Sequence, residues 1–325
     1  MPMHQRLGAF QAALLTGWIG LSAAGFLYAR AKDIPAWAAV PIIAAFLVEF
    51  SFYLVPGFEG VREKLRARLS RRQLAVALAA SATVPYLIYS IPTGQFRPTA
   101  FLDLAALAVV LCFWYVALRP SPAIDPLFLA FAAAVVLSHV LDIIYLSPIH
   151  VHLDILGKLM LIRTGAMVML ELRGVRAIGF GFVPSQSEWI TGVRYFFYFL
   201  PIGFPLALWL GLVQLGFAPF LFWKTLATFF GYLWVVALSE EFFFRGLLQQ
   251  WLADWTGRPK FALVAASVLF GAVHLPFRAF PNWKLALVAA ISGLFYGTAY
   301  RKAGSIRASM VAHALVVTVW RTVFV

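Results

Sequence analysis

The chain has 325 residues, of which 62% are hydrophobic and 12% charged, and its formal net charge is +13. Soluble globular domains have roughly half apolar and roughly a quarter charged residues, so this composition excludes that class and indicates a polytopic helical membrane protein. The basic residues lie in loops between apolar stretches, which is typical of the positive-inside rule, and no nucleic-acid partner is expected.

Apolar stretches of about 20 residues, bounded by charge, Pro or Gly, predict the transmembrane helices. In the N-terminal half they are 7–28, 34–55, 74–91, 99–118 and 127–146. The more polar stretch 153–172 is either a sixth span or a helix lying in the membrane interface, and both remain open. In the C-terminal half they are 195–215, 217–251 (too long for one simple span), 260–275, 283–300 and 306–324. The predicted fold is an all-α transmembrane bundle of about ten or eleven helices.

A Gly-rich, polar stretch at 174–191 resembles a linker and predicts two parts. Residues 1–180 would form an N-terminal bundle of about five or six spans, and residues 181–325 a second bundle that carries the polar motifs. The densest basic cluster lies between two spans, within 57–72, so we expect it, and with it the N-terminus, on the cytoplasmic side. Glu49 lies inside an apolar span, where pairing with another helix is the favoured role.

The segment from Ser239 to Arg245 places two adjacent carboxylates and an arginine within an otherwise apolar stretch. A charge in hydrocarbon costs several kcal/mol, so such groups persist where they are paired and used. Residues four apart share a helix face, and Arg245 can therefore neutralise Glu241. Glu240 points about 100° away from Glu241. One carboxylate would thus be held in a salt bridge and the other left free for chemistry.

Two histidines interrupt later apolar helices, His274 with Phe270 one turn before it, and His313. A buried Glu can serve as a base toward water, and imidazoles can donate hydrogen bonds to a developing oxyanion. The same three groups, Glu240, His274 and His313, could instead hold a divalent metal such as zinc, with an open position for water. The sequence predicts a hydrolytic site and leaves open whether a metal takes part.

The order Glu-Glu-x-x-x-Arg, then Phe-x-x-x-His, then a later His resembles the CAAX-protease and bacteriocin-processing family of intramembrane endopeptidases. The resemblance implies an all-helical protease core in which Glu240 activates water. It further implies that Glu241 and Arg245 orient Glu240, and that His274 and His313 are additional active-site ligands. The family has been described both as metalloproteases and as metal-independent glutamic proteases.

The resemblance covers roughly Tyr195 to Val325 and leaves the chain up to about Leu172 as a family-variable extension. One position departs from the family pattern, because the third motif usually reads His-x-x-x-Asn and residue 317 is Val. Ser309 or Thr318 could supply the missing polar group. Without a substitute, activity would be weak or absent.

Two other functions stay open from the sequence. One is a transporter or proton-relay protein, although no duplicated hydropathy pattern accompanies the polar residues. The other is a catalytically impaired family member that binds hydrophobic peptides, motivated by Val317. The expected partners are the lipid bilayer and a peptide or lipidated-protein substrate, whose identity the chain does not reveal. The oligomeric state is equally open.

Overall fold

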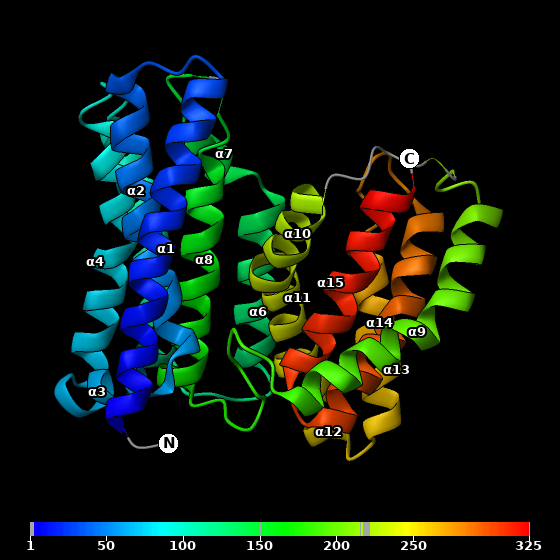
Figure 1. The fold of residues 1–325 in the computed structure, drawn as a ribbon. Coiled ribbons are helices and arrows are strands. Elements are labelled where there is room, and N and C mark those ends of the chain that lie inside the picture. The colour runs from blue at the N-terminus through cyan, green and yellow to red at the C-terminus, as the bar shows by residue number, and fades with distance from the viewer. Residues whose placement is uncertain (1–2, 150, 215, 217–221, 325) are drawn as a thin grey trace. The chain divides into compact units, whose positions relative to one another are not determined.

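A computed structural model describes residues 3–149, 151–214, 216 and 222–324, with side chains from residue 8 onward. These residues form helices and no β-strand (Figure 1), which confirms the predicted all-α class. Packing divides the chain into two compact units, Met1–Val175 and Arg176–Val325. Each unit is described by itself below.

The N-terminal unit is a bundle of long helices joined by short ones. Its elements are α1 (Met3–Ala31), α2 (Ala36–Leu54), the 3₁₀ turn η1 (Val55–Gly57), α3 (Glu59–Arg68), α4 (Arg71–Ser90), α5 (Pro98–Ala117), α6 (Ile124–Leu137), α7 (Val140–Ile144), α8 (Asp154–Met167) and the π-helix η2 (Val168–Arg173). Helix α2 packs against α1, α4 and α8, and Figure 1 shows these helices running side by side. Helix α8 therefore packs within the bundle, and both roles for 153–172 stay open.

Buried ion pairs fix this bundle. Arg163 on α8 binds Glu49 on α2, with Nε 2.6 Å from Oε1, and both side chains are almost fully buried. This contact confirms the expected pairing of Glu49 with another helix. The predicted span 127–146 is broken at His139, whose φ of 55° is left-handed. Its Nδ1 lies 2.9 Å from Asp142 Oδ2, and this local polar pair accompanies the break between α6 and α7.

The C-terminal unit contains the polar motifs. Its elements are α9 (Gln186–Trp209), α10 (Phe222–Gly231), the π-helix η3 (Tyr232–Val236), α11 (Ala237–Glu241), the π-helix η4 (Phe242–Gln249), α12 (Gln250–Thr256), α13 (Pro259–Ala272), α14 (Trp283–Ala303) and α15 (Ile306–Val323). From α10 to α12 the chain is one continuous helix of 35 residues. The start of the predicted span 217–251 and the last residue of 195–215 lie outside the described residues.

Helix α9 begins earlier than predicted, so residues 186–191 belong to a helix and not to the linker. The cause is a capping box, in which Ser185 accepts from the backbone of Glu188 and the Glu188 carboxylate accepts from the backbone of Ser185. Arg307 also binds Glu188, at 2.8 Å, and so ties the start of α9 to the start of α15.

Six helices in the described residues are long and apolar enough to cross a membrane: Gly8–Ala31, Ala36–Gly57, Arg71–Ser90, Pro98–Ala117, Gln186–Trp209 and Phe222–Thr256. Helices α6 and α13 are shorter apolar helices. The predicted spans 283–300 and 306–324 are helices α14 and α15, which are not among these six. The cytoplasmic position of the N-terminus stays a prediction.

Gly271 lets α13 and α14 approach closely, because a Cβ there would lie 2.4 Å from the backbone oxygen of Ala286. We expect Gly271→Ala to force the two helices apart and to destabilise the unit by about 1–3 kcal/mol, as overpacking usually does. The matched control is Gly231→Ala, where an added Cβ meets no atom within 4 Å. Thermal unfolding of the two purified variants measures the difference, and equal stabilities would contradict the packing role of Gly271.

Candidate active site

Glu240 and Glu241 end α11, and Arg245 lies in the π-helix that follows. π-helical segments are rare and occur often at functional sites. Arg245 Nε lies 3.1 Å from Glu241 Oε2, and both side chains are fully buried. The two atoms lack hydrogen-bond alignment, so the contact is an ion pair. The salt bridge predicted from the four-residue spacing is present.

Gly293, which no sequence motif marked, and Phe270 of the Phe-x-x-x-His motif enclose Arg245. Its Nη2 donates to the backbone oxygen of Gly293 at 3.1 Å, and its guanidinium lies 4.5 Å from the ring centroid of Phe270. A Cβ at Gly293 would come within 3.3 Å of Nη2, so a glycine leaves room for the guanidinium. A guanidinium over an aromatic face is stabilised electrostatically, most strongly when desolvated. The arginine is thus held by α13 and α14 as well as by Glu241.

His313 joins the two carboxylates from the neighbouring helix α15. Its Nδ1 lies 2.9 Å from Glu241 Oε1, and its Nε2 lies 3.8 Å from Glu240 Oε2. The imidazole stacks on the ring of Tyr296, with 4.7 Å between centroids and 14° between planes. Phe270 meets the imidazole edge-on at 5.8 Å. Two aromatic rings and one carboxylate therefore fix the orientation of His313.

The two glutamates have different surroundings. Glu241 is fully buried between Arg245 and His313. The Glu240 side chain is 32% exposed. Its buried Oε2 has no hydrogen-bond partner among the described residues. Glu241 is thus neutralised by its neighbours, whereas Glu240 keeps an oxygen that can accept a proton.

His274 stands at the edge of this group. It follows the end of α13, is partly exposed, and its Nδ1 lies 2.7 Å from the backbone oxygen of Phe270. Its ring contacts Phe270 at 4.9 Å, and Phe270 in turn contacts His313. Within the described part of the chain, no ion pair or hydrogen bond links His274 to Glu240 or Glu241. The structure therefore connects His274 to the carboxylates through Phe270.

The two side chains that could replace the missing asparagine bond to their own helix. The Ser309 hydroxyl donates to Ile306 O at 2.8 Å, and the Thr318 hydroxyl donates to Ala314 O at 2.7 Å. Val317 is only partly buried and supplies no polar atom. Besides this bond, the Ser309 hydroxyl also interacts with the Glu241 carboxylate, so Ser309 keeps a polar contact within the site.

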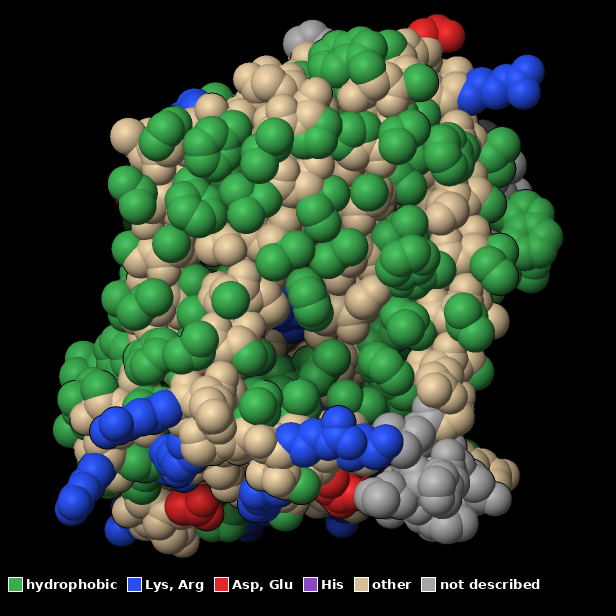
Figure 2. Space-filling view, turned by 90° about the vertical axis from the view of Figure 1, so that its left-hand side faces the viewer, with side chains coloured by type: hydrophobic (Ala, Val, Ile, Leu, Met, Phe, Trp, Pro, Cys, Tyr) green, Lys and Arg blue, Asp and Glu red, His purple; other side chains and the backbone are tan. Residues whose placement is uncertain are grey.

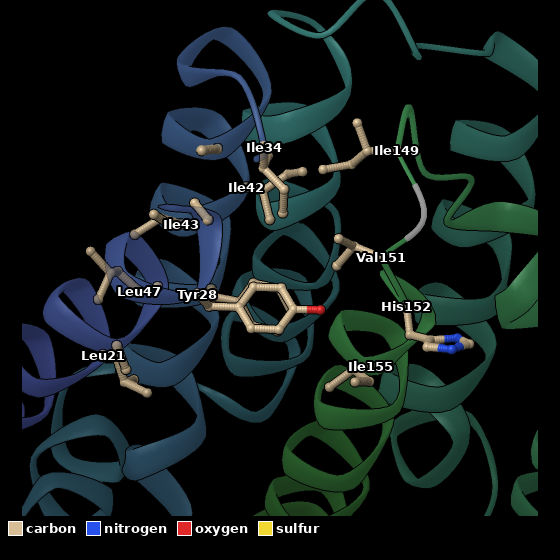
Figure 3. Close-up of a pocket in the computed structure, with 15 residues that line it drawn as sticks. Leu21, Tyr28, Ile34, Ile42, Ile43, Leu47, Ile149, Val151, His152 and Ile155 are labelled. Carbon is tan, nitrogen blue, oxygen red and sulfur yellow. The ribbon is translucent and has the colours of Figure 1, made fainter. Parts of the chain in front are cut away.

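A cavity of about 400 Å³ lies elsewhere, in the N-terminal unit. Figure 3 shows its apolar lining from α1, α2 and the segment before α8, with Tyr28 and His152 among the residues around it. It contains none of the predicted site residues.

One family model matches the chain, described as Type II CAAX prenyl endopeptidase Rce1-like, over residues 222–319. No curated protein and no solved structure matches the chain. The resemblance noted from the sequence is confirmed. This segment is a CAAX-protease-family domain.

The matched segment of this CAAX-protease-family domain contains Glu240, Glu241, Arg245, His274 and His313. It is shorter than the predicted range, because it begins at α10 and leaves out α9. The matched segment is similar at the family level to CAAX-type proteases, and the long apolar helices indicate a multi-pass membrane protein.

Proposed function

We propose that the C-terminal unit is an intramembrane endopeptidase that hydrolyses a peptide bond near the membrane with a water activated by Glu240. The observation that carries the proposal is the contrast between the two adjacent glutamates. Glu241 is bound by Arg245 and His313, whereas Glu240 Oε2 lies 3.8 Å from His313 Nε2 and has no hydrogen-bond partner among the described residues. A free carboxylate beside an oriented imidazole is the pair that acid–base hydrolysis needs.

In the proposed reaction, Glu240 takes a proton from water and the resulting hydroxide attacks the carbonyl carbon of the peptide bond. His313 donates its Nδ1–H to Glu241, and in its protonated form its Nε2–H stabilises the tetrahedral oxyanion. Glu240 then passes its proton to the leaving amine as the C–N bond breaks. His274 is proposed to contact the substrate carbonyl from the outer edge of the site.

A metal-assisted version with Glu240, His274 and His313 as ligands was left open by the sequence. The described residues contain no group of three or more His, Cys, Asp or Glu side chains placed to hold a metal ion. The arrangement of donors does not fit such a centre, so no step of the proposed mechanism runs through a metal. We expect turnover to persist in excess chelator.

The substrate class is proposed from the name of the matching family, which is a CAAX prenyl endopeptidase. The test uses the purified full chain in nanodiscs with a farnesylated peptide that ends in a Cys-aliphatic-aliphatic-X sequence. Release of the C-terminal tripeptide, measured by mass spectrometry, is the expected result. The same peptide without the farnesyl group is the control, and equal cleavage of the two would show that the lipid is not recognised.

A catalytically impaired peptide binder is a second candidate, favoured by Val317 at the position where the family motif has Asn. Loss of one oxyanion donor costs about 10²–10³ in rate. This candidate predicts that the farnesylated peptide binds to the chain and stays intact. It also predicts that Val317→Asn produces cleavage where the natural residue does not.

Tyr296 is proposed as a positioning residue, because its ring stacks on His313. We expect Tyr296→Phe, which keeps the ring, to retain kcat, and Tyr296→Leu to lower kcat about tenfold with KM little changed. The pH profile of kcat should shift only in the Leu variant, since the imidazole loses its aromatic neighbour. Parallel losses in both variants would contradict a role of the ring.

A further inference from the structure

The short helix α3 connects α2 to α4 and has basic residues on two faces. Arg62 and Arg66, four residues apart, turn toward the buried Glu171 of η2. Arg62 Nη1 lies 2.8 Å from Oε1, and Arg66 Nε lies 3.0 Å from Oε2. This face of α3 is therefore fixed to the end of α8 and η2.

The second face of α3 is made by Lys64 and Arg68, which are also four residues apart and exposed. Within the described residues, neither side chain has an ion-pair partner. Arg72, just after the Ser70 cap of α4, is exposed as well. Residues 57–73 contain six basic side chains and two acidic ones. With Glu171 there are three carboxylates for these six cations, so the region keeps a positive excess, to which the outward cations contribute.

This outward face lies at the end of the apolar helices. Helices α2 and α4, which α3 joins, are both candidate membrane spans. Large apolar side chains are exposed on the neighbouring long helices, among them Leu15, Ile19 and Trp37. Figure 2 shows this arrangement as a broad hydrophobic surface with Lys and Arg side chains gathered along its lower edge. Basic side chains at the end of a membrane-spanning helix lie at the level of the lipid headgroups.

We propose that the outward face of α3, formed by Lys64, Arg68 and Arg72, binds the phosphate groups of anionic phospholipids. Basic side chains next to a membrane span are attracted by the negative potential of the leaflet surface. The inward pair with Glu171 holds α3 in place, and the outward cations have no ion-pair partner among the described residues. The proposal does not depend on the proposed peptidase activity.

The test uses the detergent-solubilised full chain titrated with dioleoyl phosphatidylglycerol or with the neutral phosphatidylcholine of the same chains. The readout is the lipid concentration that gives half of the rise in unfolding temperature. We expect Lys64→Gln/Arg68→Gln to need about 30-fold more phosphatidylglycerol, because two surface cations are lost. Arg30→Gln/Lys32→Gln, which removes two exposed cations at the other end of α1, should behave like the natural chain.

A charge-conserving variant, Lys64→Arg/Arg68→Lys, should keep the phosphatidylglycerol response. This result would show that the Gln variant is affected by the loss of charge and not by a change of structure. Equal titrations for the Gln variant and the natural chain would overturn the proposal. Equal stabilisation of the natural chain by phosphatidylcholine and phosphatidylglycerol would also overturn it. Stabilisation of the same size by glycerol phosphate, which has no acyl chains, would assign the face to a soluble phosphate ligand and would overturn the lipid assignment.

Discussion

Glu240→Gln is expected to lower kcat about 10²–10⁴-fold, because the amide cannot take a proton from water. The fold should be preserved, since Glu240 is partly exposed and its contact with His313 Nε2 is 3.8 Å long. Turnover of the farnesylated peptide in nanodiscs, together with the unfolding temperature, measures both quantities.

The matched control for this variant is Asp254→Asn, which makes the same chemical change at an exposed position on the same continuous helix. It should leave turnover unchanged. Retained cleavage in Glu240→Gln would show that another group activates the water, and the proposed mechanism would be wrong.

Arg245→Met is expected to give the largest loss of stability, about 3–5 kcal/mol, because it leaves the fully buried Glu241 carboxylate without its cation. The thioether side chain has a similar length, so the effect reports on charge more than on volume. Unfolding of the purified chain by titration with sodium dodecyl sulfate measures the free energy.

The double variant Glu241→Gln/Arg245→Met removes both charges and should recover much of this stability, because no buried charge stays unpaired. It should remain inactive, because His313 loses the carboxylate that binds its Nδ1. A double variant as unstable as Arg245→Met alone would show that the arginine stabilises the unit through Phe270 and Gly293 and not through the ion pair.

The sequence could predict contacts between residues of the same helix. The spacing of Glu241 and Arg245 was enough to predict their ion pair, since residues four apart share a helix face. The order of the motifs was enough to predict the family of the C-terminal segment. Helix positions followed from apolar stretches, because membrane-spanning segments must be long and apolar.

The contacts between helices could not be predicted in the same way. Tyr296 and Gly293 lie on α14 among other aromatic and small residues, and nothing in their spacing marks them as neighbours of His313 and Arg245. Glu49 was expected to find a partner, but only the fold shows that the partner is Arg163. The placement of His274 beyond Phe270 likewise depends on where α13 ends.

Local polar chemistry explains the two places where the predicted helix boundaries were wrong. A capping box at Ser185 extends α9 into the predicted linker, because two backbone and side-chain hydrogen bonds compensate for its polar composition. The interruption at His139 lies in a run without Gly or Pro, where Ser138, His139 and Asp142 are the polar residues.

The central claim is that Glu240, as the base toward water, and His313, as the donor to the oxyanion, act together in one reaction. A double-mutant cycle on kcat/KM with Glu240→Gln and His313→Ala tests it most directly. Groups that act as a unit are strongly non-additive, so the double variant should be about as slow as the slower single variant. If the two losses instead multiply, the side chains act independently, and the pairing seen at 3.8 Å is not the catalytic one.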